Sequence, residues 1–454
     1  MSTHDLQSVI ESDHRHLIHP LHHPSTHQTP KIWVKGEGST LTDVEGKQYL
    51  DGLAGLWNVN VGHGRKELAQ AGARQMETLA YASAYSGSSN LNAIQLAERL
   101  SRLAYPQINA FFFTSGGGES TDSAIKTARY YWQVQGKTDK IKIISREQAY
   151  HGVTLAAMSA TGIPAYWSMF GPKVPGFFHI PSPYPLYFNH GFQPSDRSPT
   201  PGIAAANLLE DAILTEGADT VAAFIAEPVQ GAGGVIVPQE DYFKRIREIC
   251  DQYQVLFIAD EVITGFGRTG RWFALDHWGV QPDIMNFAKG VTSGYVPLGG
   301  IGVSDDIKEL MDTVEPSKRW MHAYTYSAHP TTCAVALANL DYFDTHDLVS
   351  RAAETGAHLQ AGLKSLEANH PKVGEARGIG MLGALELLEE RATRRKFDPD
   401  AKMGVKLNEQ ATQRGLWSRN KDDVYVLAPP LTTTRDEVDR IVNILDESLT
   451  ALAC

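Results

Sequence analysis

The feature that most constrains this chain is a pair of charged residues, each placed at the end of a short apolar segment. Asp260 follows the segment 255–259, and Lys289 follows the segment 284–288. Both segments are typical of strands that are buried in a parallel sheet. Because open α/β sheets bind ligands at the carboxyl ends of their strands, we expect Asp260 and Lys289 to face a common site.

The middle of the chain alternates such strands with amphipathic helices. Strands are expected at 110–114, 140–145, 221–226, 255–259 and 284–288, and helices from about residue 120 and over 241–253. A hairpin is expected over 39–51, a helix over 90–104, and a last helix whose start Thr434 and Glu437 would cap. The alternation predicts an α/β fold with a mostly parallel sheet between two layers of helices.

The length of 454 residues predicts more than one domain. Beyond about residue 331 the pattern changes to long helices and a few short strands. We therefore predict a small domain that is built from an N-terminal segment (1–75) and a C-terminal part (335–454). The large domain would span 76–334.

Composition excludes several classes of protein. The net charge of −11 and the lack of a basic run argue against a nucleic-acid partner. No apolar stretch approaches membrane-spanning length, and the polar N-terminus lacks the apolar core of a signal peptide. Three cysteines without metal-type spacing do not form a disulfide framework. We expect a soluble cytoplasmic enzyme.

Histidines gather near the N-terminus, at positions 14, 16, 19, 22, 23 and 27. Such clustering can signal a metal site. No constellation of Asp or Cys ligands accompanies it in the sequence, however. We therefore expect a surface arm whose histidines pack or form hydrogen bonds, and no metal site.

A glycine cluster, Gly116–Gly118, lies between a predicted strand and a predicted helix. Glycines let the backbone approach an anion, and the start of a helix offers N–H groups and a positive dipole. A phosphate is the natural ligand, although a flexible turn would have the same composition. The later segment Gly265–Gly270 lacks the strand–GxGxxG–helix order of a dinucleotide site, so we interpret it as a turn-rich loop.

The chemistry of Asp260 and Lys289 suggests one cofactor. A buried lysine tends to lose its proton, and the neutral amine can form a Schiff base with a carbonyl. A buried carboxylate needs a partner, and a protonated pyridine nitrogen would be one. Together they point to pyridoxal phosphate. The alternatives are a structural aspartate that caps the next segment and an exposed loop lysine. Tyr150 could stack on the cofactor ring or be an ordinary core tyrosine.

Seven motifs in one order resemble the class III pyridoxal-phosphate-dependent aminotransferases, and within them the ω-amino acid or amine:pyruvate branch. The resemblance runs from about residue 17 to 449. The motifs are Gly55–His63, the glycine cluster, Tyr150–Gly152, Glu227–Gly231, Asp260–Val262, Lys289–Gly290 and Tyr324–Ser327. The resemblance implies the aspartate-aminotransferase fold (fold type I), with a mostly parallel seven-stranded sheet in the large domain and a small α+β domain.

The resemblance also implies roles in binding pyridoxal 5′-phosphate. Lys289 would hold the cofactor as a Schiff base and then move the proton during catalysis. Asp260 would pair with the pyridine nitrogen, while Tyr150 and Val262 would cover the two faces of the ring. The remaining cofactor-binding residues would be Gly117 and Gly118 at the phosphate, Gln230 near the phenolic oxygen, and Tyr324 and Thr325 at the phosphate of a neighbouring subunit. The shared site implies a homodimer or homotetramer.

Substrate recognition would rest on Arg419, which would bind a carboxylate, and on Trp57 and Tyr85, which would line the amine pocket. Relatives that act on ornithine or 4-aminobutyrate often carry a glutamate where Ala232 stands, and that glutamate screens the arginine. Its absence favours a monocarboxylate acceptor such as pyruvate, which would leave as alanine after a ping-pong reaction. Two alternatives within the family stay open: a 2-oxoglutarate-dependent ω-aminotransferase, and a decarboxylase or aminomutase. A nucleotide-binding protein would need sequence motifs that are missing here.

One residue departs from the family pattern in the phosphate site. The family's glycine cluster usually has a serine where Gly118 stands, so a hydroxyl is missing. The loss of one such hydrogen bond costs about 1.5–3 kcal/mol when the partner is charged. We expect weaker retention of the cofactor, or compensation by a nearby hydroxyl such as that of Ser120 or Thr121.

Overall fold

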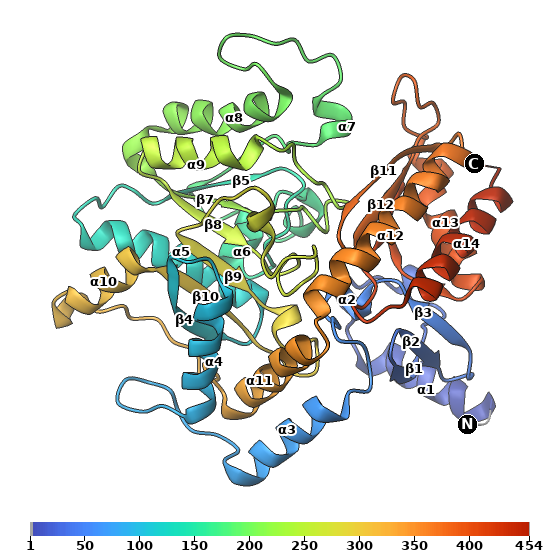
Figure 1. Cartoon of the computed structure of the whole chain (residues 1–454), viewed down its shortest axis with the longest axis horizontal. Coiled ribbons are helices and arrows are strands. Elements are labelled where there is room, and N and C mark those ends of the chain that lie inside the picture. Colours follow the sequence, from blue (N-terminus) through green and yellow to red (C-terminus); the bar gives the residue numbers. More distant parts are fainter. Residues whose placement is uncertain (1–2, 454) are drawn as a thin grey trace.

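The computed structural model describes residues 3–453, which form a larger part around one wide sheet and a smaller part that contains both ends of the chain (Figure 1). Within these residues the wide sheet has seven strands in the order β4-β10-β9-β8-β7-β5-β6. Their bounds are β4 (Ile108–Thr114), β5 (Lys142–Arg146), β6 (Phe177–Ile180), β7 (Val221–Ala226), β8 (Leu256–Asp260), β9 (Ile284–Phe287) and β10 (Gly299–Ser304).

The strands of the wide sheet are mostly parallel, as the sequence predicts. Each neighbouring pair from β6 through β5, β7 and β8 to β9 is parallel, while β10 runs antiparallel to both β9 and β4. All residues of β7, β8 and β9 are buried. The side chains of successive strand residues point to opposite faces of the sheet. On β8, Phe257 therefore packs in one apolar cluster and Ile258 in another.

Helices cover both faces of this sheet, as expected for an α/β fold. On α9 (Tyr242–Gln252) the residues Tyr242, Phe243, Ile246, Ile249 and Cys250 are buried. The helices of the larger part are α3 (Lys66–Thr78), α4 (Leu91–Leu103), α5 (Gly117–Val134), α6 (Leu155–Ala160), α7 (Pro185–Phe188), α8 (Pro201–Glu216), α9 (Tyr242–Gln252), α10 (Asp305–Thr313) and α11 (Pro330–Thr345). Two of them, α3 and α4, both pack on α11 at the lower edge of the molecule in Figure 1.

The smaller part joins segments from both ends of the chain. One of its sheets has the order β1-β2-β3-β13, in which β13 pairs in parallel with β3, and the other has the order β11-β12-β15-β14. The strands are β1 (Trp33–Glu37), β2 (Thr40–Asp43), β3 (Gln48–Asp51), β11 (Val373–Ile379), β12 (Leu382–Leu387), β13 (Leu416–Trp417), β14 (Arg419–Lys421) and β15 (Val424–Leu427). The helices are α1 (Thr3–His16), α2 (Ala54–Trp57), α12 (Leu348–Asn369), α13 (Met403–Gln413) and α14 (Arg435–Ala451).

The helix α14 begins with the capping box that the sequence predicts. The side chain of Thr434 accepts a hydrogen bond from the N–H of Glu437, and the carboxylate of Glu437 accepts one from the N–H of Thr434. The pairing of β13 with β3 agrees with a small domain assembled from both ends of the chain. The boundaries that we proposed at 75 and 334 stay predictions.

Two strands of the wide sheet were not expected, and β10 shows why. Its sequence is rich in glycine, which is unfavourable in strands. The glycine is required by close packing, because a Cβ atom added to Gly300 would lie 2.5 Å from the ring of Phe287. The proline-rich connection between β6 and α8 contains the short helix α7. Among the described residues no helix is long and apolar enough to span a membrane.

Candidate active site

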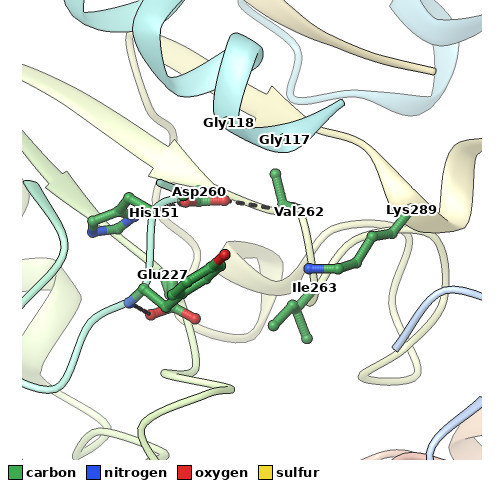
Figure 2. A pocket seen from close by; sticks show the side chains of 10 residues that line it. Gly117, Gly118, His151, Glu227, Asp260, Val262, Ile263 and Lys289 are labelled. Atoms are coloured by element: carbon green, nitrogen blue, oxygen red, sulfur yellow. Dashed lines mark hydrogen bonds and ion pairs between the residues drawn. The ribbon is translucent and has the colours of Figure 1, made fainter. Parts of the chain in front are cut away.

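The carboxyl ends of the central strands meet at one cavity, as the strand pattern predicts. Asp260 ends β8, Glu227 follows β7 directly, and Lys289 comes two residues after β9. The cavity is lined by Gly117, Gly118, Tyr150, His151, Gly152, Glu227, Asp260, Val262, Ile263 and Lys289. Figure 2 shows Lys289 reaching into this space from the side opposite to His151, with the start of α5 along its rim. The structure therefore gathers six of the predicted cofactor residues around one space.

Lys289 is held in an environment that favours its neutral form. Burial lowers the pKa of the amine from its usual value, and the negative charges of Asp260 and Glu227 only partly oppose this effect. Within residues 3–453 no carboxylate forms an ion pair with its Nζ atom. Its backbone adopts a φ of 46°, a left-handed conformation that is uncommon for residues other than glycine and is often found at functional sites. The structure thus presents a reactive amine at a fixed place.

Asp260 is fixed from two sides. Its Oδ2 accepts a hydrogen bond of 2.7 Å from Nδ1 of the buried His151, and its Oδ1 accepts one of 3.1 Å from the N–H of Val262. These contacts define the orientation of the carboxylate at the edge of the cavity. No role for His151 was predicted, although its place next to Tyr150 at the same rim was a usable signal.

The start of α5 forms a backbone surface that suits an anion. The first N–H groups of a helix have no partner within the helix, and the helix dipole is positive there. Gly152 packs so closely that a Cβ atom on it would lie 2.8 Å from Cα of Gly118. Such a surface fits a phosphate, which is the ligand that the glycine cluster predicts.

The expected replacement for the missing serine hydroxyl is wrong in detail. The hydroxyl of Ser120 donates to the carbonyl of Gly116, and that of Thr121 accepts from the amide of Asn286, so both are buried and turned toward the sheet. The hydroxyl near position 118 is instead that of Thr154, which lies 3.4 Å from the carbonyl oxygen of Gly118. Helical periodicity separates positions 118 and 120 onto different faces, and the hydroxyl of Thr121 is engaged by Asn286 on β9.

Glu227 is a second buried acid at the cavity, and no role for it was predicted. Its two carboxylate oxygens accept hydrogen bonds of 2.9 Å from the N–H groups of Tyr150 and Gly231. Burial raises its pKa, and the nearby Asp260 acts in the same direction. Glu227 directly follows β7, just as Asp260 ends β8. The sequence signal that predicted Asp260, a charged residue at the end of an apolar strand, could therefore also have predicted Glu227. We interpret Glu227 as the residue that holds the Tyr150 segment in place.

Two of the three predicted substrate residues lie next to each other beside the cavity. The guanidinium of Arg419 lies over the ring of Trp57 at 5.3 Å. Its charge also acts on Tyr150, whose pKa is raised mainly by burial. Tyr85 lies on the segment between α3 and α4 and is 54% exposed. The structure therefore places Arg419 and Trp57 together and leaves Tyr85 on the outside of the single chain.

Three predicted cofactor residues point elsewhere in the single chain. Gln230 accepts a hydrogen bond of 2.6 Å from Ser182 and donates one of 2.8 Å to the carbonyl of Glu147, so it does not line the cavity. The hydroxyl of Tyr324 donates to a carbonyl at the start of α5, at 3.5 Å. The carbonyl of Thr325 accepts a hydrogen bond from Tyr81.

Comparison with known proteins identifies the family. The pattern of the family described as "Aminotransferase class-III" matches residues 22–449. This chain belongs to the class III aminotransferases. Enzymes of this family depend on pyridoxal phosphate, and this aminotransferase does as well.

Curated relatives and solved structures agree with this assignment. The putrescine–pyruvate aminotransferase of Pseudomonas aeruginosa is 41% identical over 421 residues, which cover 92% of this chain and 90% of the relative. The diaminobutyrate–2-oxoglutarate transaminase of Halomonas elongata is 39% identical over 456 residues, which cover 97% and 95%. The structure of an (S)-enantioselective ω-transaminase from Thermomicrobium roseum superimposes with a TM-score of 0.94 and 46% identity, covering 98% of each chain. The fold is therefore the fold type I architecture of these transaminases.

The cavity of this aminotransferase fits the cofactor in charge and shape. The start of α5 offers N–H groups to a phosphate, the Asp260 carboxylate can pair with a protonated ring nitrogen, and the amine of Lys289 can react with an aldehyde. Val262 packs against Gly117, because a Cβ atom on that glycine would lie 3.0 Å from its Cγ1. The phosphate, the ring nitrogen and the aldehyde of pyridoxal phosphate thus each have a suitable residue along the rim.

Proposed function

We propose that this enzyme transfers the amino group of an amine or ω-amino acid to pyruvate, and so produces an aldehyde or ketone and alanine by a ping-pong mechanism. The observation that carries the proposal is Arg419, which lies over Trp57 beside the cavity while no carboxylate within residues 3–453 forms an ion pair with it. The small side chain of Ala232 stands where relatives for dicarboxylates carry a screening glutamate. An unscreened arginine suits a monocarboxylate.

When bound, pyridoxal phosphate supplies an aldehyde that takes up the amino group and a ring that withdraws electrons. In this proposal the cofactor is held by Lys289, by Asp260 and by the N–H groups of Gly117 and Gly118. Tyr150 and Val262 cover the two faces of its ring. We also retain Gln230, Tyr324 and Thr325 as proposed cofactor residues, the last two from a neighbouring subunit in a homodimer or homotetramer. Their side chains would then have to act across the subunit boundary or after rearrangement.

Lys289 is the residue that we propose for the proton transfer. Burial lowers the pKa of the Lys289 amine and so favours the neutral Nζ atom, which can accept a proton from the carbon that bears the donor amino group. Asp260 stays aligned through His151 and the N–H of Val262, so that it can face a positive ring nitrogen. Glu227 orients the Tyr150 segment and does not contact the reacting atoms in this scheme.

Arg419 is the residue that we propose for binding the acceptor. A guanidinium offers two parallel N–H donors, which match the carboxylate of pyruvate. The stacking on Trp57 keeps this cation next to an apolar surface that can also receive the carbon chain of an amine. Trp57 and Tyr85 would form the amine pocket, Tyr85 after subunit assembly because it is exposed in the single chain.

The relatives support pyruvate without deciding the acceptor. The printed name of the relative from Pseudomonas aeruginosa includes pyruvate, whereas that of the relative from Halomonas elongata includes 2-oxoglutarate. A 2-oxoglutarate-dependent ω-aminotransferase is therefore the second candidate.

One experiment tests both candidates. The purified holoenzyme is given a panel of diamines, ω-amino acids and aryl amines with either pyruvate or 2-oxoglutarate, and the alanine or glutamate formed is measured. We expect kcat/KM to be higher with pyruvate for most donors. In Arg419→Ala we expect a loss of about 1.5–3 kcal/mol in kcat/KM for pyruvate, because a hydrogen bond to a charged group is removed. The half-reaction with a plain amine should change little, which serves as the control. Faster glutamate formation in the wild-type enzyme would refute the proposal.

A further inference from the structure

Two histidines and one aspartate converge near the N-terminus, on a feature that the aminotransferase reaction does not use. Asp13 lies on α1, while His19 and His27 lie on the segment that follows it. The Nε2 atom of His27 is 2.7 Å from Oδ2 of Asp13, and Nε2 of His19 is 3.1 Å from both of its carboxylate oxygens. The ligand atoms of the three residues all lie within 4.8 Å of one another.

We propose that Asp13, His19 and His27 form a binding site for a divalent transition metal ion such as Zn²⁺. Two imidazole nitrogens and one carboxylate oxygen are a common set of zinc ligands, and a fourth position would be left for water. The clustered histidines can signal a metal site in the sequence, but which of them converge on Asp13 depends on the fold of the segment after α1.

The geometry around these residues favours a built site over a loose arm. The rings of His19 and His27 lie with their centroids 3.8 Å apart, so both Nε2 atoms are directed to the same carboxylate. A hydrogen bond of 2.8 Å joins Nε2 of His14 to the carbonyl of His27 and so fixes the backbone of a ligand residue. The three ligand side chains are 18–25% exposed, which limits their motion but leaves the ion a path from solvent.

The charge of the cluster also suits a cation, because the Asp13 carboxylate faces the Nε2 atoms of both His19 and His27. A metal ion would replace the shared protons between the carboxylate and the two rings. It would then tie the last turn of α1 to the segment that contains the short 3₁₀ turn Pro24–Thr26.

Neighbouring histidines provide matched controls. His22 stacks on His19 with centroids 6.2 Å apart, but it is not one of the three converging residues. His23 accepts a hydrogen bond from the N–H of Ser25 and contacts its hydroxyl, so it serves the adjacent turn. Loss of either side chain removes an imidazole from the same arm and leaves the proposed ligands in place.

The test is a calorimetric titration of the full-length holoenzyme with ZnCl₂ after dialysis against a chelator. We expect one ion per chain in the wild-type enzyme and in His22→Ala and His23→Ala. In His19→Ala, His27→Ala and Asp13→Asn we expect affinity to fall at least about tenfold, because one ligand of three is lost. No binding to the wild-type enzyme, or equal binding to all variants, would overturn the proposal.

A second measurement guards against a change in folding. Transaminase turnover should be the same in all five variants, because none of the changed residues lines the catalytic cavity.

With Co²⁺ as the probe, visible absorption bands of the bound metal should appear in the wild-type enzyme and disappear in His19→Ala and His27→Ala. Zn²⁺ should also slow proteolytic cleavage within residues 1–30 of the wild-type enzyme but not of these two variants. Protection that persists in them would contradict the assignment of the ligands.

Discussion

The cavity at Lys289 and the contact around Arg377 are both buried groups of charges, but their hydrogen bonding differs. Arg377 on β11 donates to Oε2 of Glu386 on β12 at 2.6 Å and to the carbonyl of Gly234 at 2.6 Å. The hydroxyls of Tyr184 and Tyr187 donate to the same Glu386 carboxylate. Burial raises the pKa of both tyrosines, so their hydroxyls stay protonated and keep donating.

Lys289 has no comparable set of partners. Within the part of the chain that the structure describes, no carboxylate lies within ion-pair distance of its Nζ atom, and burial lowers its pKa. A satisfied buried network joins elements rigidly, whereas a buried ionisable group without a partner is a sign of a functional site. The comparison indicates that Arg377 connects the smaller part of the molecule to the larger part, while Lys289 is left available for chemistry.

The largest expected effect is on turnover. Lys289→Ala should lower kcat by about 10²–10⁴-fold, because the proton acceptor is lost. Its thermal midpoint should not fall, since no hydrogen bond of the described structure depends on this amine. The control is Lys140→Met, in which a buried lysine that donates to the carbonyls of Ala218 and Tyr253 is removed. That variant should lose stability and keep its turnover; the reverse pattern would break the comparison.

The next effect is on stability. Arg377→Leu leaves the buried Glu386 without its cation, and we expect the free energy of unfolding to fall by about 3–5 kcal/mol. Arg197→Leu is the control, because Arg197 forms ion pairs with Glu210 and Asp211 on the surface and should cost about 0–1 kcal/mol. Urea unfolding curves of the two variants give both values. Equal losses of unfolding free energy in the two variants would show that burial does not make the Arg377 contact more important for stability.

The sequence predicted the active-site rim because its signals are local. An apolar strand followed by a charged residue can be read from a few neighbouring letters, which placed Asp260 and Lys289 on the same edge of the sheet. The helix after the glycine cluster was also expected, although it starts at Gly117 and not near 120.

Features that depend on distant partners could not be predicted. β10 needs glycines because of the ring of Phe287, and the Arg377 contact joins residues that are far apart in the chain. The hydroxyl near Gly118 belongs to Thr154, on another segment, and not to the neighbours Ser120 or Thr121. In each case the deciding contact is made in space and leaves no pattern in the local sequence.

The third effect is on the affinity of the cavity for its cofactor. A Cβ atom added to Gly118 would lie 3.6 Å from Cγ2 of Thr154, which is an ordinary contact. Gly118→Ser should therefore fit, and its hydroxyl should strengthen binding of pyridoxal phosphate by about 1.5–3 kcal/mol. In Gly117→Ser the added Cβ atom would lie 3.0 Å from Val262, so no gain is expected. The rate of cofactor release after dilution is measured for both variants. An unchanged rate in Gly118→Ser would show that Thr154 already supplies the missing hydrogen bond.

The smallest effect is the pH dependence of stability in the cofactor-free enzyme. Because the pKa of Lys289 is lowered on folding, the unfolded chain binds more protons at this residue, and folding stability rises with pH from the lowered value up to about 10.4. Each unit of lowering costs the folded state about 1.4 kcal/mol below that range. Lys289→Met removes the cost, so it should stabilise the cofactor-free enzyme most at neutral pH and progressively less as the pH rises. The pH-dependent part of the difference isolates the amine from any constant effect of methionine packing. A difference that does not change with pH would mean that the folded cavity holds Lys289 charged, and the contrast with Arg377 would then fail.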